Sequence, residues 1–167
     1  MLSRVFSFIM AIIITLFPFL WKPGKSTISN ETVANAVISS VENKDAAAME
    51  EVMCKNIKDN YEDLTGEINN MLSLIEGEVD STSWERGYSR STSDGNGKTI
   101  SHNALSINVN TTDGAYVLLL AVEIQNTVSP EELGIRRVEL IRLAENPDQE
   151  ATKLYEIAAT EGIMKWH

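Results

Sequence analysis

Two hydrophobic patterns follow one another along the chain, and the first is helical. Apolar residues recur three or four positions apart between Ser29 and a turn at 43–45, which predicts an amphipathic helix with Ser29 or Asn30 as its N-cap. The last residue of this turn caps a second predicted helix, 45–53. A third helix is predicted over 57–76, because a glycine follows directly where a C-terminal cap is expected.

The second pattern has the two-residue period of β-strands. The turn sequences Asp94-Gly95-Asn96-Gly97 and Thr112-Asp113-Gly114 separate its first three runs, of which the first is a long polar strand and the second alternates. The predicted strands are residues 79–92, 100–110, 116–124 and 135–143. The third of these runs is almost continuously apolar, which is typical of a central strand covered on both faces.

These elements predict one α+β domain at residues 26–167, with three helices followed by a four-stranded antiparallel meander. The tail, 148–167, contains apolar residues that fit either a short amphipathic helix or an extended segment closing one end of the sheet. We therefore expect the tail to dock on the domain.

An uncharged apolar run occupies residues 5–21, between Arg4 and Lys22. As a helix it would be roughly 25 Å long, slightly short of a hydrocarbon core of about 30 Å. No small-x-small cleavage site follows it, so residues 1–25 are predicted to be a hydrophobic helix with a short tether, which anchors the domain outside the cell membrane. Cleavage within 23–29, which would give a secreted domain, and a core helix of the domain are the alternatives.

Composition narrows the class of partner. The net charge is −10, and without Arg4, Lys22 and Lys25 the chain has 11 basic against 24 acidic residues, a net charge of −13. Such an acidic surface disfavours nucleic acids and anionic lipid surfaces. Cys54 is the only cysteine, so an internal disulfide and a multi-cysteine metal site are excluded, and we expect a small buried hydrophobe there. The sequence predicts no metal site and no cofactor.

Three low-specificity motifs carry a resemblance to a known family. They are an Asn-Lys-Asp turn between helices, a helix ending in Glu-Gly and a strand containing Trp84, within residues 28–145. The chain resembles the domain-of-unknown-function family 5104, a group of bacterial lipoprotein-like domains similar to the nuclear-transport-factor-2-like, or cystatin-like, superfold. The resemblance implies a cone in which a curved sheet wraps the helices. Members commonly carry a lipid-attachment cysteine after the apolar run, and this chain has none there.

Relatives within that superfold include isomerases and dehydratases with an Asp, His or Tyr in the cone, and many proteins that only bind a partner. The nameable pair here is His102 with Glu123, which fits the roles of base and orienter in proton transfer if both face one cavity. Trp84, Tyr88 and Tyr116 on neighbouring strands complete a candidate ligand-binding set with His102. A solvated histidine and a glutamate at the water-facing end of a strand are the alternative interpretation.

Two function classes remain open. The first is a non-catalytic extracytoplasmic binding module for a small apolar molecule, a peptide or a second copy of the chain, with a homodimer through the sheet. The second is a small hydrolase or isomerase that uses His102 and Glu123 for acid and base catalysis. Arg136 and Arg137 are expected on opposite faces of the last strand and solvated.

Overall fold

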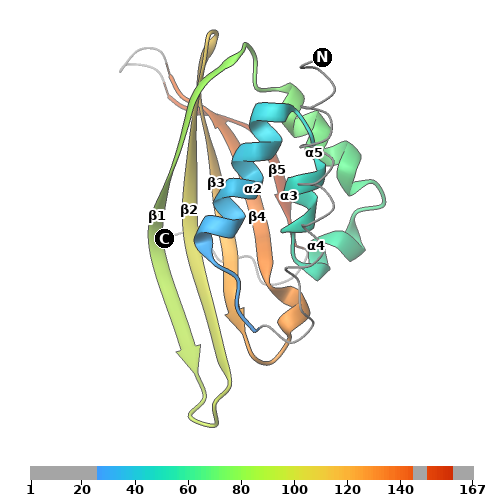
Figure 1. Ribbon diagram of the computed structural model, residues 1–167, viewed down its shortest axis with the longest axis vertical. Coiled ribbons are helices and arrows are strands. Elements are labelled where there is room, and N and C mark those ends of the chain that lie inside the picture. The colour runs from blue at the N-terminus through green and yellow to red at the C-terminus, as the bar shows by residue number, and fades with distance from the viewer. Residues whose placement is uncertain (1–25, 145–149, 160–167) are drawn as a thin grey trace, which may run out of the picture.

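The described residues form a layer of helices against one face of an antiparallel sheet (Figure 1). The computed structural model describes residues 26–144 and 150–159, so the predicted anchor at 1–25 lies outside the described residues. The helices are α2 (Asn30–Asn43), α3 (Ala47–Glu51), α4 (Lys55–Asn60) and α5 (Leu64–Ser73). The strands are β1 (Val79–Ser93), β2 (Thr99–Thr111), β3 (Gly114–Asn126), β4 (Gly134–Arg142) and β5 (Thr152–Ala158), with a short 3-10 helix η2 (Pro130–Glu132) before β4.

The sequence-based prediction of three helices is wrong, because the third predicted helix is two helices. The chain between α4 and α5 becomes extended at Tyr61 (φ −107°, ψ 119°). Asp63 then starts α5 by accepting the amide hydrogen of Gly66. The apolar spacing continues across this break because Ile57 in α4 and Leu64 in α5 are buried in the same core. Periodicity therefore did not reveal the interruption.

Of the predicted helix caps, Ser29 is confirmed, whereas the N-cap of α3 is Ala46 rather than Asp45 and the C-cap of α5 is Leu74 rather than Gly77. Ser29 is the N-cap of α2 and accepts the amide hydrogen of Thr32 at 3.0 Å. The Asp45 carboxylate accepts the amide hydrogen of Ala47 at 3.1 Å, just before α3. Lys44, which has a left-handed backbone (φ 52°), donates to the carbonyl oxygens of Leu72 and Ile75 at the end of α5. This last contact joins two helix ends that are distant in sequence.

The prediction of a four-stranded sheet is also wrong, because the described residues contain a fifth strand. The sheet is a meander in the order β1-β2-β3-β4-β5, and each neighbouring pair is antiparallel. The fifth strand comes from the tail, for which an extended segment was one of two expected forms. Ile157 of β5 packs into the core opposite Val138, and Tyr61 accepts the amide hydrogen of Ala158 at 3.2 Å. The tail needed these partners to become a strand, and its own sequence pattern did not specify them.

The helices cover only one face of the sheet, here called the helix face; the opposite one is the open face (Figure 1). The core lies between the helices and the helix face, where Leu105, Ile107, Leu118 and Leu120 are buried. Asn103 belongs to the same face, because its amide donates to Asn30 of α2 at 2.8 Å. The open face therefore holds the residues between these positions.

Candidate functional site

A charged cluster on the open face joins three strands at Glu123. Glu123 of β3 lies opposite His102 on β2 and Gly134 on β4. The register of β2 and β3 shifts between Ser101 and His102 and leaves Ile124 of β3 as an extra residue, and a second shift, between β3 and β4, leaves Arg136 as an extra residue. These β-bulges re-aim side chains, and they bring His102 and Arg136 to the two sides of one carboxylate.

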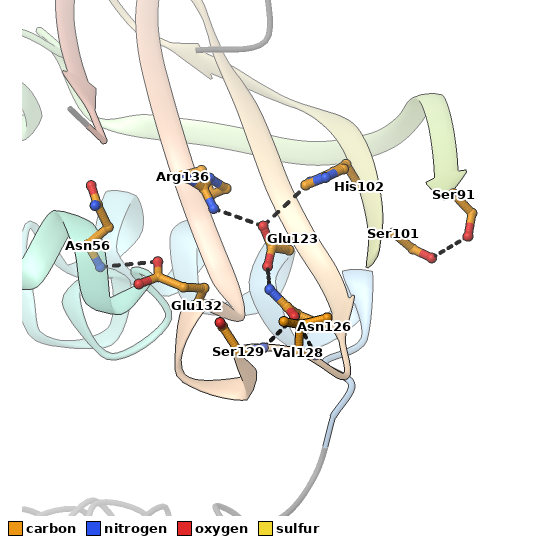
Figure 2. Close-up of polar contacts among 10 residues, drawn as sticks. All are labelled: Asn56, Ser91, Ser101, His102, Glu123, Asn126, Val128, Ser129, Glu132 and Arg136. Carbon is orange, nitrogen blue, oxygen red and sulfur yellow. Dashed lines mark hydrogen bonds and ion pairs between the residues drawn. The ribbon is translucent and has the colours of Figure 1, made fainter. Parts of the chain in front are cut away.

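The carboxylate of Glu123 has a partner at each oxygen (Figure 2). The Arg136 Nη1 atom lies 2.9 Å from Glu123 Oε2, and the amide of Asn126 donates to Glu123 Oε1. The His102 Nδ1 atom is 3.7 Å from the same Oε2, which is beyond hydrogen-bond distance. The structure thus brings the predicted pair together, while the carboxylate bonds to Arg136 and Asn126.

The centre of this cluster is buried. Glu123 is only 1% exposed, and the Arg136 guanidinium beside it is the ion-pair partner that a buried carboxylate needs. The pKa of His102 is lowered, chiefly because burial disfavours the imidazolium. Arg136 and Arg90 lower it further, whereas Glu123 opposes them. Among the described residues, the buried Nδ1 of His102 has no hydrogen-bond partner.

Asn126 connects the cluster to the loop that follows β3. Its side-chain oxygen accepts the amide hydrogens of Val128 and Ser129 at 2.9 and 2.7 Å (Figure 2). The side-chain oxygen of Asn126 thus binds the loop, and its side-chain nitrogen donates to Glu123. This arrangement makes Asn126 a positioning residue for the carboxylate.

Sequence reasoning missed both Asn126 and the role of Arg136. Arg136 and Arg137 were expected on opposite faces, but the bulge in β4 places both guanidinium groups on the open face. Arg137 lies opposite Ala121 of β3. Its guanidinium forms ion pairs with Glu139 and with Glu156 of β5. An extra residue in one strand cannot be inferred from alternation alone, so no sequence signal separated the two arginines.

The other predicted ligand-binding residues do not line one surface with His102. Tyr116 is 1% exposed, and its hydroxyl accepts the amide hydrogen of Glu76 at 3.2 Å. Trp84 is half-buried and packs against the core from the helix face, opposite Ile107. Tyr88 is 65% exposed on the edge strand. The structure separates these aromatic rings by face and by burial.

Cys54 is fully buried, and burial raises the pKa of its thiol. Its amide hydrogen bonds to the carbonyl of Ile135 at 3.0 Å, where the helical layer meets the start of β4. Within the described residues, no three His, Cys, Asp or Glu side chains gather as metal ligands. No helix in this described part of the chain has both the length and the apolar character needed to cross a membrane.

Comparison with known families identifies the chain. A family model described as a domain of unknown function (DUF5104) matches residues 36–143, well over half of the chain. This chain belongs to that family. The match includes the entire Glu123 cluster and ends after β4, so β5 lies beyond it. A search of curated proteins gave no significant match.

Proposed function

We propose that this member of the DUF5104 family is a non-catalytic binding domain on the outer side of the cell membrane. Its binding surface is the centre of the open face, around Leu119. The observation that carries the proposal is the bonding of Glu123. Its carboxylate is bonded to Arg136 and Asn126 and lies beyond hydrogen-bond distance of His102, so it does not orient the imidazole as a catalytic pair requires.

The location rests on residues 5–21 and on the acidic remainder of the chain. An uncleaved apolar run would hold the domain at the membrane, and a short tether would separate the two. We also propose that the domain is lipoprotein-like and that its fold is related to the nuclear-transport-factor-2-like superfold. Cleavage of the run would give the same domain in secreted form.

The open face has the composition of a contact surface. Leu119 lies at its centre and is 36% exposed, one of five large apolar side chains with substantial exposure in the described residues. Ion pairs flank it: Glu139 lies opposite Leu119 on β4, and Glu123 is four residues further along β3. An apolar centre with a polar rim is the usual anatomy of an interface. A peptide segment with an apolar side chain over Leu119 is the partner that fits it.

Native mass spectrometry of the full chain, extracted from membranes of its host, tests this proposal. We expect an intact mass that includes residues 1–25 and a retained peptide or protein. Leu119→Glu should remove the retained species, whereas Val128→Glu, a matched change at an exposed loop position, should keep it. A trimmed chain in the soluble fraction would contradict the anchor. Equal retention by both variants would contradict the binding surface.

A second candidate function is supported by the position of His102. Burial lowers the pKa of His102, which favours the neutral imidazole, and with Nδ1 3.7 Å from a carboxylate the Nε2 atom is the candidate base. The long distance is compatible with a pair that tightens when a substrate binds. Hydrolysis of p-nitrophenyl acetate by the full chain would test this chemistry. Enzyme-dependent turnover that is lost in both His102→Ala and Glu123→Gln would favour catalysis over binding.

A further inference from the structure

Strand β1 is a long and exposed edge of the sheet. It spans 15 residues, and β2 is its only strand neighbour among the described residues (Figure 1). From Glu85 to Ser93 every side chain is exposed. The outward N–H and C=O groups of an edge strand can pair with another strand, so natural edges are usually blocked. The side chains of β1 favour one register of pairing with a second strand.

A β-bulge divides β1 at Gly87 and Tyr88. Arg86 lies opposite Leu105 of β2, and Ser89 lies opposite Asn103, so β1 has one more residue than β2 in this interval. Leu105 and Asn103 both belong to the helix face. Residues directly opposite one another share a face, so Arg86 and Ser89 belong to the helix face as well.

The bulge places two opposite charges on the open face. Glu85 lies opposite Ser106, and Arg90 lies opposite His102, so both belong to the open face. They are five positions apart, and in a regular strand an odd separation would put them on opposite faces. The extra residue in the bulge removes this mismatch. No ion pair within the described residues uses Glu85 or Arg90.

We infer that two copies of this chain pair antiparallel through β1, about a two-fold axis between Gly87 and Tyr88. In this register Glu85 of each copy lies opposite Arg90 of the other, which gives two symmetric ion pairs on the open face. Arg86 lies opposite Ser89, and Trp84 opposite Ser91, so faces match on both sides of the bulge. The two bulge residues of one copy, Gly87 and Tyr88, lie opposite the same two residues of the other copy. The contact between the two β1 strands therefore needs no additional bulge.

Gly87 and Tyr88 fit the centre of this interface. Each Tyr88 would lie opposite Gly87 of the second copy, and an aromatic side chain across from a strand glycine covers backbone that glycine leaves open. A Cβ atom at Gly87 would approach Ala104 no closer than 3.5 Å, so this position has room on its own side of the sheet. Pairing would cover part of the Tyr88 ring, which is 65% exposed in the single chain. The inference concerns the edge strand and is independent of the binding surface around Leu119.

Reciprocal charge changes test the pairing. Sedimentation velocity of the detergent-solubilised full chain should give a species of twice 18.5 kDa. Glu85→Arg and Arg90→Glu alone should each weaken dimerisation at least about tenfold, because each change places like charges opposite one another twice. The double variant E85R/R90E should restore the dimer. Lys98→Glu, the same change of charge as Arg90→Glu but in the hairpin turn, should have no effect.

A disulfide test checks the register. Ser83 and Thr92 are predicted to face each other across the two-fold axis, whereas within one chain they lie along the same strand, too far apart to be bridged. Ser83→Cys/Thr92→Cys should give a covalent dimer on mild oxidation. The matched control Ser83→Cys/Ser91→Cys, with its cysteines on opposite faces, should remain uncrosslinked. A monomeric wild-type chain, a dimer insensitive to the charge changes or equal cross-linking of both pairs would overturn the inference.

Discussion

Leu118 and Leu119 are adjacent leucines of β3 with opposite environments. Leu118 faces the helices and is fully buried, whereas Leu119 faces away from them and is 36% exposed. Their strand was predicted to be covered on both faces; the helix face is covered along its centre, whereas the open face is buried at Ala121 and Glu123 but not at Leu119. The difference shows that an apolar run on a central strand has two separate uses. One side holds the core, and the other is available for contact.

The polar residues of the two faces differ in the same way. On the helix face, the Tyr116 hydroxyl serves the backbone by accepting the Glu76 amide hydrogen. On the open face, Glu123 forms an ion pair with Arg136, and His102 lies beside it. The first arrangement supports packing, and the second concentrates charge at the surface of the sheet. Four mutational tests can sharpen or break this contrast.

The largest difference is expected between Leu118→Ala and Leu119→Ala. Truncation of the buried Leu118 leaves a cavity and should lower the free energy of unfolding by about 3 kcal/mol or more. The same truncation at Leu119 should cost under about 1 kcal/mol, because this side chain is already partly solvated. Urea unfolding followed by circular dichroism measures both. Equal losses would mean that the open face is covered as firmly as the helix face.

Glu123→Ala is expected to have the next largest effect. It would leave Arg136 and the Asn126 amide without their carboxylate partner, and breaking a buried ion pair costs about 3–5 kcal/mol. Because Arg136 is partly exposed and can be solvated, we expect a loss of about 2 kcal/mol. The control is Glu85→Ala, an exposed glutamate on β1, with a change near zero in the monomer. Equal stability of both variants would show that the cluster contributes no folding energy.

Tyr116→Phe tests the hydrogen bond on the helix face. The ring keeps its packing, but the Glu76 amide loses an acceptor, and we expect a cost of about 1 kcal/mol. Tyr88→Phe removes the same atom from an exposed ring and should leave the stability unchanged. Thermal unfolding of both variants, compared at equal concentration, measures the difference. A larger loss of stability in Tyr88→Phe would contradict the view that the Tyr116 hydroxyl supports the fold and the Tyr88 hydroxyl does not.

The smallest effect is the pH dependence caused by His102. Its lowered pKa means that the unfolded chain binds a proton more readily than the folded chain. The associated stability is present above a pH of about 6.5, the ordinary histidine value, and is lost as pH falls toward the lower pKa of the folded state. His102→Gln should therefore lose less stability than the wild type on acidification. An NMR titration of the imidazole that gives a raised pKa would contradict this.

Prediction from sequence succeeded for the elements whose signals are local. The Ser29 cap and the hairpin turn at 94–97 each depend on a few neighbouring residues, and the structure contains both. The resemblance to the family was confirmed over residues 36–143. The break at Tyr61 was not predicted, and the extended form of Thr152–Ala158 was only one of two expected for the tail, because both features depend on packing against distant segments.

The candidate site shows the same division. The sequence by itself provided the identities of His102 and Glu123, the apolar character of β3 and the acidic charge of the domain. Only the tertiary structure decided that Arg136 and Asn126 hold Glu123, that Tyr116 belongs to the core, and that Glu85 and Arg90 share a face. The physical reason is the β-bulge. One extra residue changes which side chains meet across strands, and it follows from pairing with a neighbour rather than from the sequence of a single strand.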